Sequence, residues 1–281
     1  MKTFTKNGVK RLAAGFVALS GKTAIGRYFY GQVIDSAMER VQRVSHGDLD
    51  LTFAIPNAVC KFRADTFSTK EPETLEWIDA IPRGSTLWDI GANVGLYACY
   101  AAKARGCRVF AFEPSVFNLE TLARNIFLNG LTDRITIIPL PLSDRLTLSK
   151  LNMTATEWGG ALSTFGQGYG HDGAPIGKVF EVPTIGLSML DAVNLLGIRQ
   201  PDYVKMDVDG IEHLILEGGV PILRGTMSVS IEINDDFHAQ ANDASRWLQA
   251  AGLSLKQKRH AEYFDSSPGP ARHTFNQVWT R

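Results

Sequence analysis

The stretch LWDIGANVGLYACYAAKA, residues 87–104, decides the fold class of this chain. A β-rich run ends at Asp89, a turn with Gly91 and Gly95 follows, and small apolar residues at helical spacing continue to Lys103. A strand, a glycine-containing turn and a helix N-terminus together anchor nucleotides, because the turn brings the backbone close to the ligand. The spacing of the glycines then indicates which nucleotide is bound.

The glycines of this turn are not at the spacing of a dinucleotide site. A dinucleotide-binding turn has the pattern G-x-G-x-x-G, in which the second glycine lets the pyrophosphate approach. Here the pattern is D-x-G-x-N-x-G, with Asn93 in the middle glycine position. Asparagine is the residue other than glycine that best tolerates left-handed backbone angles. The carboxylate of Asp89 would repel a pyrophosphate, whereas it can bind the ammonium group of an amino acid.

A second carboxylate follows at the end of the next expected strand. Glu113 closes the run VFAFE, and Pro114 comes directly after it. A carboxylate about 20 residues beyond such a turn is placed to accept both hydroxyls of a ribose, at the edge where open α/β sheets bind ligands. Together, Asp89 and Glu113 predict a nucleoside that carries a cationic amino acid, which is S-adenosylmethionine.

Strands and helices alternate around this stretch. We expect strands at 85–90, 107–112, 134–140, 178–185, 202–207 and 228–233, with a closing pair at 253–258 and 273–280. Helices are expected at 71–81, 94–105, 116–129, 188–197, 211–223 and 238–251. Strands that alternate with helices of this length indicate βαβ units and a parallel sheet, and therefore an α/β fold.

Residues 158–177 interrupt the alternation with seven glycines and little periodic pattern. A long glycine-rich loop inside a compact domain is more often a substrate lid or a binding loop than a plain connection. Its aromatic residues Trp158, Phe165 and Tyr169 suit stacking on the face of a sugar, with core packing as the competing interpretation.

The overall composition gives no reason to expect a nucleic-acid partner. Lysine plus arginine equals aspartate plus glutamate, at 29 each in 281 residues. The three cysteines, Cys60, Cys99 and Cys107, lie at no metal-binding or CxxC spacing. This cysteine usage fits a reduced, cytoplasmic compartment.

We divide the chain into an N-terminal extension, residues 1–70, and a catalytic domain, residues 71–281. The extension begins with a basic helical segment. It continues with two apolar runs, 51–57 and 59–67, that we interpret as an antiparallel β pair joined by a Pro-Asn turn.

The basic helical segment has an amphipathic pattern. Val9, Leu12, Phe16 and Leu19 recur near helical spacing, and the apolar run is too short to span a bilayer, which takes about 20 apolar residues. Packing of this helix on the main domain, or on a second subunit of a homo-oligomer, is the interpretation we favour. Weak peripheral contact with a membrane is the alternative.

Five segments resemble, in this order and spacing, the FkbM family of S-adenosylmethionine-dependent methyltransferases. They are DIGANVGLY, VFAFEPSVFNLETLARNIFLNG, IIPLPLSD, YVKMDVDGIEHLILEGG and SVSIEIND, and the similarity covers residues 85–235. The resemblance implies a Rossmann-like class I methyltransferase fold with a seven-strand, mostly parallel sheet and one antiparallel strand. It also implies O-methylation of a hydroxyl on a saccharide, a polysaccharide precursor or a similar glycan.

The resemblance further implies cofactor-binding residues. Those that line the methionine part of S-adenosylmethionine are Asp89, Gly91, Asn93 and Gly95. By the same likeness Glu113 binds the ribose, and Ser143 and Asp144 lie near the adenine. Where family members often have D-V-E-G, this chain has D-V-D-G at 207–210.

Polar residues gather at the ends of the fourth and fifth strands of the expected sheet. Methyl transfer is an in-line displacement, so the protein mainly positions the acceptor oxygen and excludes water, and a general base adds about 10²–10⁴-fold. We predict catalytic roles for Asp207, Asp209, Glu232 and His213. A packing role is the competing interpretation for His213, because it lies on a helix among apolar residues.

Two interpretations of this cluster remain open. In the first, Asp207 or Asp209 accepts the proton of the acceptor hydroxyl and Glu232 completes the site. In the second, oxygens of these three residues and of Asn234 hold a hard divalent ion that polarises the hydroxyl. We favour the interpretation without a metal, because the residues are not at the spacing of a dedicated metal loop.

Two other functions compete with methyl transfer. The fold could belong to a cofactor-binding interaction module without catalysis, because a fold alone never implies activity. It could also belong to an NAD-dependent dehydrogenase or epimerase. The number of polar groups at the end of the fourth strand favours an enzyme over an inert module.

Overall fold

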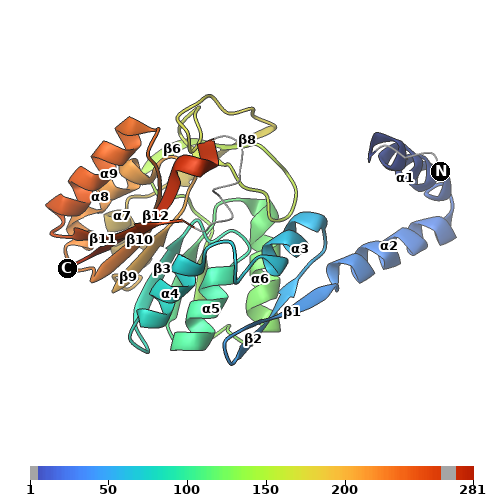
Figure 1. The fold of residues 1–281 in the computed structure, drawn as a ribbon. Coiled ribbons are helices and arrows are strands. Elements are labelled where there is room, and N and C mark those ends of the chain that lie inside the picture. Colours follow the sequence, from blue (N-terminus) through green and yellow to red (C-terminus); the bar gives the residue numbers. More distant parts are fainter. Residues whose placement is uncertain (1–5, 261–269) are drawn as a thin grey trace.

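The protein forms an α/β fold around a seven-stranded sheet (Figure 1). The computed structural model describes residues 6–260 and 270–281. The strand order is β11-β12-β10-β9-β3-β4-β5, and β12 runs antiparallel to both β10 and β11 while the other neighbours are parallel. The strands are β3 (Thr86–Ile90), β4 (Arg108–Phe112), β5 (Ile135–Ile138), β9 (Tyr203–Met206), β10 (Ser228–Asn234), β11 (Ser254–Arg259) and β12 (Thr274–Thr280). The predicted mostly parallel sheet with one antiparallel strand is confirmed.

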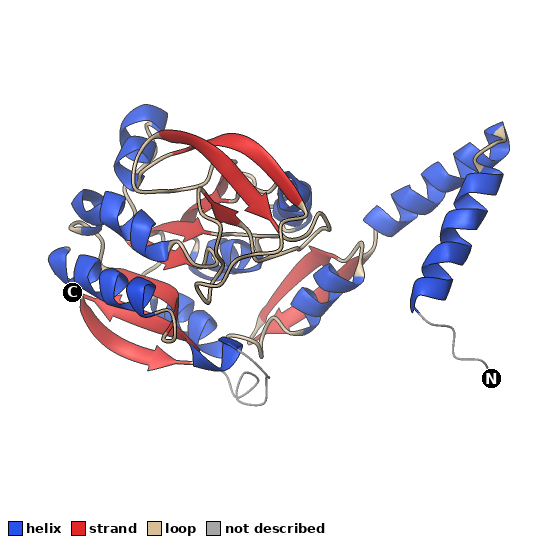
Figure 2. Ribbon diagram, turned by 90° about the horizontal axis from the view of Figure 1, so that it is seen from above, coloured by secondary structure: helices blue, strands red, loops and turns tan. Residues whose placement is uncertain are grey.

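Helices cover both faces of this sheet and enclose a hydrophobic core on each (Figures 1 and 2). The central strand β3 is buried at every position, as expected for a strand covered on both faces. One core lies under α4 (Pro72–Ala80), α5 (Leu96–Arg105) and α6 (Val116–Leu128). The other lies under α7 (Met189–Leu196), α8 (Glu212–Leu223) and α9 (His238–Ala250), and the short helix η1 (Pro270–His273) precedes β12.

A second sheet of three strands lies between β5 and α7 in the sequence. It contains β6 (Thr147–Met153), β7 (Thr164–Phe165) and β8 (Phe180–Gly186), in the order β7-β6-β8. The strand expected at 178–185 therefore exists but belongs to this smaller sheet. Its partner β6 was not predicted, because its first half has alternately exposed and half-buried side chains and carries no continuous apolar run.

The N-terminal β pair differs from the prediction. Strand β2 (Leu49–Ala54) pairs with the upstream strand β1 (Val41–His46), and the expected second strand is the helix α3 (Ala58–Asp65). The reason is local: the side chain of Asn57 accepts a hydrogen bond from the backbone N–H of Cys60 and caps the helix N-terminus. The predicted pairing of 51–57 with 59–67 is therefore wrong.

One buried asparagine connects strand β2 to the turn between β3 and α5 through hydrogen bonds. Asn125 of α6 accepts a hydrogen bond from Ala54 N at 2.7 Å and donates one to the carbonyl of Val94, also at 2.7 Å. Leu51 and Phe53 of the same strand are buried in the core beneath α5. The division of the chain at residue 70 stays a prediction, because the two segments share this core.

Replacing Asn125 by alanine is expected to lower the free energy of unfolding by about 2–4 kcal/mol. The change leaves a buried N–H and a buried carbonyl without partners, and each such group costs about 1–3 kcal/mol. Urea denaturation followed by circular dichroism measures the loss. Asn242→Ala, at an exposed position of α9, is the matched control and is expected to change stability by less than about 0.5 kcal/mol. An equal effect of both variants would contradict the bridging role.

Two N-terminal helices, α1 (Lys6–Ser20) and α2 (Ala24–Met38), form a hairpin that projects from the rest of the protein (Figures 1 and 2). The predicted packing of the basic helix on the main domain is therefore not what the structure shows. Within the described residues, no helix is long and apolar enough to cross a membrane.

Candidate active site

The turn between β3 and α5 has the backbone conformation that its sequence indicated. Gly91, Asn93 and Gly95 have φ values of 82°, 51° and 81°, so Asn93 adopts the left-handed conformation. A Cβ atom on Gly91 would lie 1.9 Å from the carbonyl oxygen of Asp207. Only glycine lets the turn approach the end of β9 this closely, which brings the two strand ends into one site.

Glu113, at the end of β4, is fixed beside this turn. Its carboxylate accepts hydrogen bonds from the backbone N–H groups of Asn93 and Ser115, each at 2.8 Å, and from Asn118 Nδ2 at 3.4 Å. Burial raises the pKa of Glu113 to about 7, against the lowering effect of these donors. The side chain is therefore oriented before any ligand binds.

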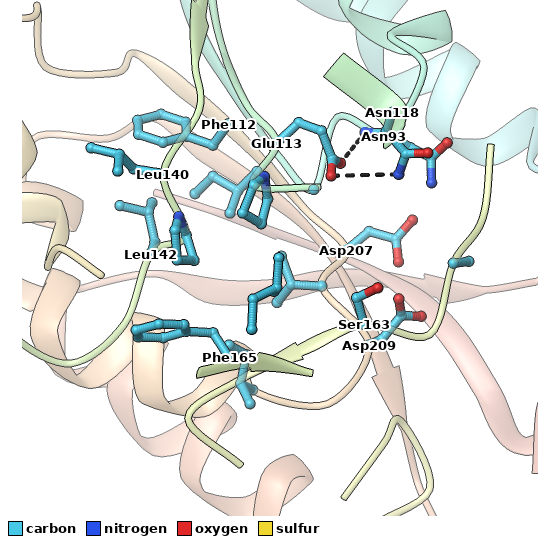
Figure 3. Close-up of a pocket in the computed structure, with 18 of the residues that line it drawn as sticks. Asn93, Phe112, Glu113, Asn118, Leu140, Leu142, Ser163, Phe165, Asp207 and Asp209 are labelled. Atoms are coloured by element: carbon cyan, nitrogen blue, oxygen red, sulfur yellow. Dashed lines mark hydrogen bonds between the residues drawn. The ribbon is translucent and has the colours of Figure 1, made fainter. Parts of the chain in front are cut away.

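A cavity of about 570 Å³ extends from Glu113, and we call it the nucleoside cavity (Figure 3). Its polar end has Asn93, Glu113 and Asn118. Its apolar end is formed by Phe112, Leu140, Leu142, Leu151 and Phe165. A carboxylate beside an apolar slot suits a ribose joined to a flat base.

Ser143 and Asp144 follow this lining but do not belong to it. Ser143 donates a hydrogen bond from its Oγ to Asp144 Oδ1 at 3.0 Å, and its backbone N–H donates one to the carbonyl of Leu187. The part of this segment that lines the nucleoside cavity is Leu140, Pro141 and Leu142. The proximity of Ser143 and Asp144 to an adenine stays a prediction.

A second cavity of about 480 Å³ lies on the other side of the turn, and we call it the turn cavity. Gly91, Ala92 and Asn93 form one wall. The opposite wall has residues from α3, its following loop, α5 and β9, namely Arg63, Thr66, Phe67, Lys70, Glu71, Tyr97, Lys205 and Asp207.

Asp89 lies beneath the turn rather than in the lining of either cavity. Lys205 Nζ is 3.6 Å from Asp89 Oδ1 and 3.5 Å from Asp207 Oδ2. Neither oxygen of Asp89 has a hydrogen-bond partner among the described residues. Burial lowers the pKa of Lys205, but the nearby carboxylates outweigh it and raise that pKa, so the ammonium group stays charged. Direct contact of Asp89 with an amino-acid ligand stays a prediction.

A third cavity of about 740 Å³ joins the ends of β9 and β10, and we call it the carboxylate cavity. It brings together three of the four predicted catalytic residues, Asp207, Asp209 and Glu232. Basic groups from other segments, Arg63, Lys70 and His171, complete its lining. Gly91, Asn93 and Asp207 line all three cavities, so the cavities meet at these three residues.

The three carboxylates of this cavity have different surroundings. Asp209, with φ of 62°, accepts a hydrogen bond from Leu162 N at 2.8 Å, and burial together with the charge of Asp207 raises its pKa to about 6. Burial and the charge of Asp207 also raise the pKa of Glu232 well above its usual range. Glu232 is therefore the carboxylate best suited to hold a proton near neutral pH.

Three carboxylates lie close enough together to hold a metal ion. They differ from the set Asp207, Asp209, Glu232 and Asn234 of the metal-binding alternative. Ligand atoms of Glu71, Asp207 and Glu232 lie within 4.8 Å of one another. The Oδ1 atom of Asn234 instead accepts a hydrogen bond from Asp236 N at 3.0 Å. Lys70 Nζ is 2.7 Å from Glu71, so an ammonium group already compensates part of this negative charge.

His213 and Glu212 do not line the carboxylate cavity. His213 packs against Phe237, with ring centroids 6.0 Å apart, and burial lowers its pKa. Glu212 accepts hydrogen bonds from Val208 N at 3.0 Å and Gly210 N at 3.1 Å, and from Gln240. These bonds hold the turn after β9, so Glu212 positions Asp207 and Asp209.

The stability of the protein is expected to depend on pH through Glu212. Burial raises its pKa to about 7, so the folded state binds more protons than the unfolded state between about pH 4.5 and pH 7. This contribution to stability is present below the unfolded pKa and is lost as the pH rises through the folded pKa. Wild-type protein should therefore lose more stability than Glu212→Gln between about pH 5 and pH 7.5.

Urea denaturation at the two pH values measures this difference. Glu217→Gln, an exposed position on the same helix, is expected to follow the wild type. Equal pH dependence of the wild type and Glu212→Gln would show that Glu212 does not carry the effect.

The glycine-rich loop lies over the nucleoside cavity and is held there at its backbone. The carbonyl of Gly160 accepts hydrogen bonds from Asn93 Nδ2 at 2.8 Å and Asn118 Nδ2 at 3.1 Å. Arg63 Nε donates to the carbonyl of Gly159 at 2.8 Å. Gly160, Ala161, Ser163 and Phe165 belong to the cavity lining, so the segment covers the site as a lid would.

The three aromatic residues of the glycine-rich loop do not form one cluster. Phe165 is buried in the core and lines the nucleoside cavity, while Tyr169 packs on Phe237 with ring centroids 5.3 Å apart. Trp158 contributes a backbone carbonyl that accepts a hydrogen bond from Asn57 Nδ2 at 2.9 Å. Stacking of these rings on a sugar stays a prediction.

The site residues that the sequence analysis missed include four polar residues far from the strand ends: Arg63, Lys70, Glu71 and His171. They come from the segment after β2 and from the glycine-rich loop, far in sequence from the strand ends. No spacing rule links them to β9 or β10. For Arg63 and His171 the one available signal was a basic side chain inside an otherwise apolar or glycine-rich segment, whereas Lys70 and Glu71 lie in a polar segment that gave none.

The seven-stranded, mostly parallel sheet with helices on both faces defines a Rossmann-like α/β fold. Residues 89–255 match the FkbM methyltransferase domain, and the chain belongs to this family. The resemblance noted in the sequence is thereby confirmed.

The proteins similar to this chain include two relatives and one solved structure. It is 28% identical over 172 residues to hexuronic acid methyltransferase AglP of Haloferax volcanii, covering 60% of this chain and 64% of AglP. It is 34% identical over 83 residues to ribosomal protein arginine N-methyltransferase rmt3 of Schizosaccharomyces pombe, covering 29% of this chain and 15% of rmt3. The chain thus spans less than two thirds of either relative.

The solved structure is methyltransferase FkbM from Methylobacillus flagellatus. Its TM-score is 0.50 at 14% sequence identity, over 80% of this chain and 53% of that one. This similarity supports the fold assignment.

Proposed function

We propose that the protein is an S-adenosylmethionine-dependent O-methyltransferase that methylates a hydroxyl of a saccharide or similar glycan. The observation that carries the proposal is the position of Glu113. Its buried carboxylate stands between the Asn93 turn and the apolar end of the nucleoside cavity. The nucleoside cavity meets the carboxylate cavity at Gly91, Asn93 and Asp207. A nucleoside cofactor and a hydroxylated acceptor can therefore meet at one point.

The residues present fit this cofactor. Glu113 would accept the ribose hydroxyls, the apolar slot would enclose the adenine, and the turn cavity would receive the amino-acid part. Beneath the turn, the carboxylate oxygens of Asp89 have no hydrogen-bond partner among the described residues, so Asp89 could accept a hydrogen bond from the ammonium group of the cofactor. When bound, S-adenosylmethionine supplies an electrophilic methyl group on a sulfonium centre.

The carboxylate cavity supplies the groups that prepare the acceptor. Glu232 accepts the proton of the acceptor hydroxyl, and Asp207 orients that hydroxyl toward the point where the cavities meet. Lys205 Nζ lies 3.5 Å from Asp207 Oδ2 and offsets part of the negative charge of this cavity. Asp209 holds Leu162 of the lid, so it closes the site against water.

A saccharide acceptor is supported by the chemistry of this cavity and by one relative. The carboxylates and basic side chains of this cavity can bind sugar hydroxyls. Arg63 or Lys70 can also bind an acidic substituent of the sugar. AglP, which is similar to this chain, is named a hexuronic acid methyltransferase.

A tritium-methyl transfer assay tests the function. The protein is incubated with labelled S-adenosylmethionine and a panel of glycans and lipids from lysed cells, with and without EDTA. Label in a glycan that alkaline ester hydrolysis does not remove supports ether formation on a hydroxyl. Loss of transfer in EDTA would favour a divalent ion at Glu71, Asp207 and Glu232 over the metal-free site.

Thermal shifts separate the competing functions. A larger shift with NAD than with S-adenosylmethionine would contradict the methyltransferase assignment and favour a dehydrogenase or epimerase. Binding of S-adenosylmethionine without transfer to any acceptor would favour an interaction module.

A further inference from the structure

The helical hairpin of α1 and α2 has a large apolar surface that the rest of the protein does not cover. Seven of its apolar side chains are each more than half exposed: Val9, Leu12, Phe16, Leu19, Ile25, Tyr28 and Ile34. Figure 2 shows the hairpin projecting away from the seven-stranded and three-stranded sheets. Soluble domains seldom expose so much contiguous apolar surface, and such a surface indicates a binding site for a partner or a membrane.

The two helices are fixed to each other, so the hairpin is a structured unit. Tyr30 Oη donates hydrogen bonds toward the carbonyls of Phe16 at 2.7 Å and Val17 at 2.6 Å. The rings of Phe16 and Phe29 also meet edge to face at 6.4 Å. Thr23 caps α2 by accepting a hydrogen bond from Gly26 N at 3.0 Å.

The charge of the hairpin has one sign over most of its length. The first acidic residue of the chain is Asp35, and six lysines and arginines precede it. On α1, the exposed Lys10 and Arg11 lie off the face that carries Leu12, Phe16 and Leu19. This combination of a basic edge and an apolar face is typical of helices that lie in a membrane interface.

We propose that the hairpin docks the protein on an anionic lipid surface. Its apolar side chains would enter the boundary between headgroups and acyl chains, while its basic side chains contact lipid phosphates. Neither helix is long enough to span the bilayer, so the hairpin lies in the interface. A second copy of the chain is a poorer occupant, because pairing two hairpins would bring like charges together.

Docking would also place the active site near the lipid surface. Helix α2 ends at Met38, and β1 begins at Val41, so the connection is short. The pair of β1 and β2 leads into α3, which carries Arg63 of the carboxylate cavity. The docking proposal does not depend on the chemistry at that cavity.

Vesicle co-sedimentation of the full chain tests the proposal. Vesicles of phosphatidylcholine with about 30% phosphatidylglycerol are expected to bind the protein, and vesicles of phosphatidylcholine alone to bind it about tenfold less. Raising the salt from about 0.1 M to about 0.5 M should weaken the binding, because salt screens exposed charges. Equal binding to both vesicles, or binding to neither, would overturn the proposal.

Two pairs of variants test the contributions of charge and apolar contact. Lys10→Glu with Arg11→Glu should lower binding about tenfold or more, whereas the control Arg108→Glu with Lys256→Glu, at exposed positions of β4 and β11, should not. Leu12→Ser with Leu19→Ser removes side chains that are 61% and 70% exposed. Its control, Leu148→Ser with Leu195→Ser, removes side chains that are 73% and 61% exposed outside the hairpin.

Thermal unfolding of each variant shows that the fold is kept. Equal loss of binding in the hairpin variants and their controls would contradict a specific docking surface. Concentration-dependent dimerisation that the Leu12→Ser, Leu19→Ser variant abolishes, without vesicle binding, would assign the surface to a second copy and overturn the proposal.

Discussion

Replacing Glu113 by alanine is expected to weaken S-adenosylmethionine binding roughly 100-fold. The proposed contact has two ribose hydroxyls that donate to one carboxylate, and hydrogen bonds to charged groups are worth about 1.5–3 kcal/mol each. The effect should be large because the carboxylate is already oriented by Asn93 N and Ser115 N, so the wild-type protein loses little entropy when it binds. Isothermal titration calorimetry measures the change.

The same substitution also removes the acceptor of two backbone N–H groups, so loss of folding must be separated from loss of contact. Glu113→Gln keeps the volume and one acceptor oxygen, and it should still bind the cofactor about tenfold more weakly. The melting temperature without ligand reports on the fold. Glu217→Ala, at an exposed position of α8, is the control. A dissociation constant within threefold of wild type in a folded Glu113→Gln protein would refute the ribose assignment.

Replacing Glu232 by glutamine is expected to lower kcat about 10²–10⁴-fold while the cofactor affinity stays the same. Glu232 lines the carboxylate cavity but not the nucleoside or turn cavity, so its loss should affect the acceptor side alone. Its pKa is raised well above the usual range by burial and by the charge of Asp207. For this reason, wild-type kcat should increase with pH as Glu232 ionises, and the variant should lack that increase.

Steady-state kinetics at saturating cofactor, repeated across pH, tests this prediction. Asp207→Asn offers a contrast, because Asp207 lines all three cavities and its loss should change both cofactor affinity and kcat. Glu217→Gln should leave both quantities unchanged. An unchanged kcat for Glu232→Gln would remove Glu232 from the chemistry and leave Asp207 and Asp209 as the candidate bases.

Several features could be predicted because they are encoded locally. The turn at 89–95 and the carboxylate of Glu113 follow fixed spacings along consecutive strand–turn–helix units, and parallel strands bring their ends to one edge. The same rule placed Asp207 and Glu232 in one cavity, because β9 and β10 are neighbours. The strand at 178–185 was predicted as a strand, but its sequence did not indicate which sheet it joins.

The sequence by itself determined the α/β class, the nucleoside-type turn and the acidic ends of β9 and β10, since each depends on residues close together in the chain. Only the tertiary structure decided that Lys205 pairs with Asp89, that Glu212 holds a turn and that Arg63 and Glu71 reach the site. The physical reason is that burial and charge pairing act between segments that meet only after folding. The residues of the turn that begins at Asp89 indicate the class of ligand, whereas the side chains that surround the turn come from distant parts of the chain.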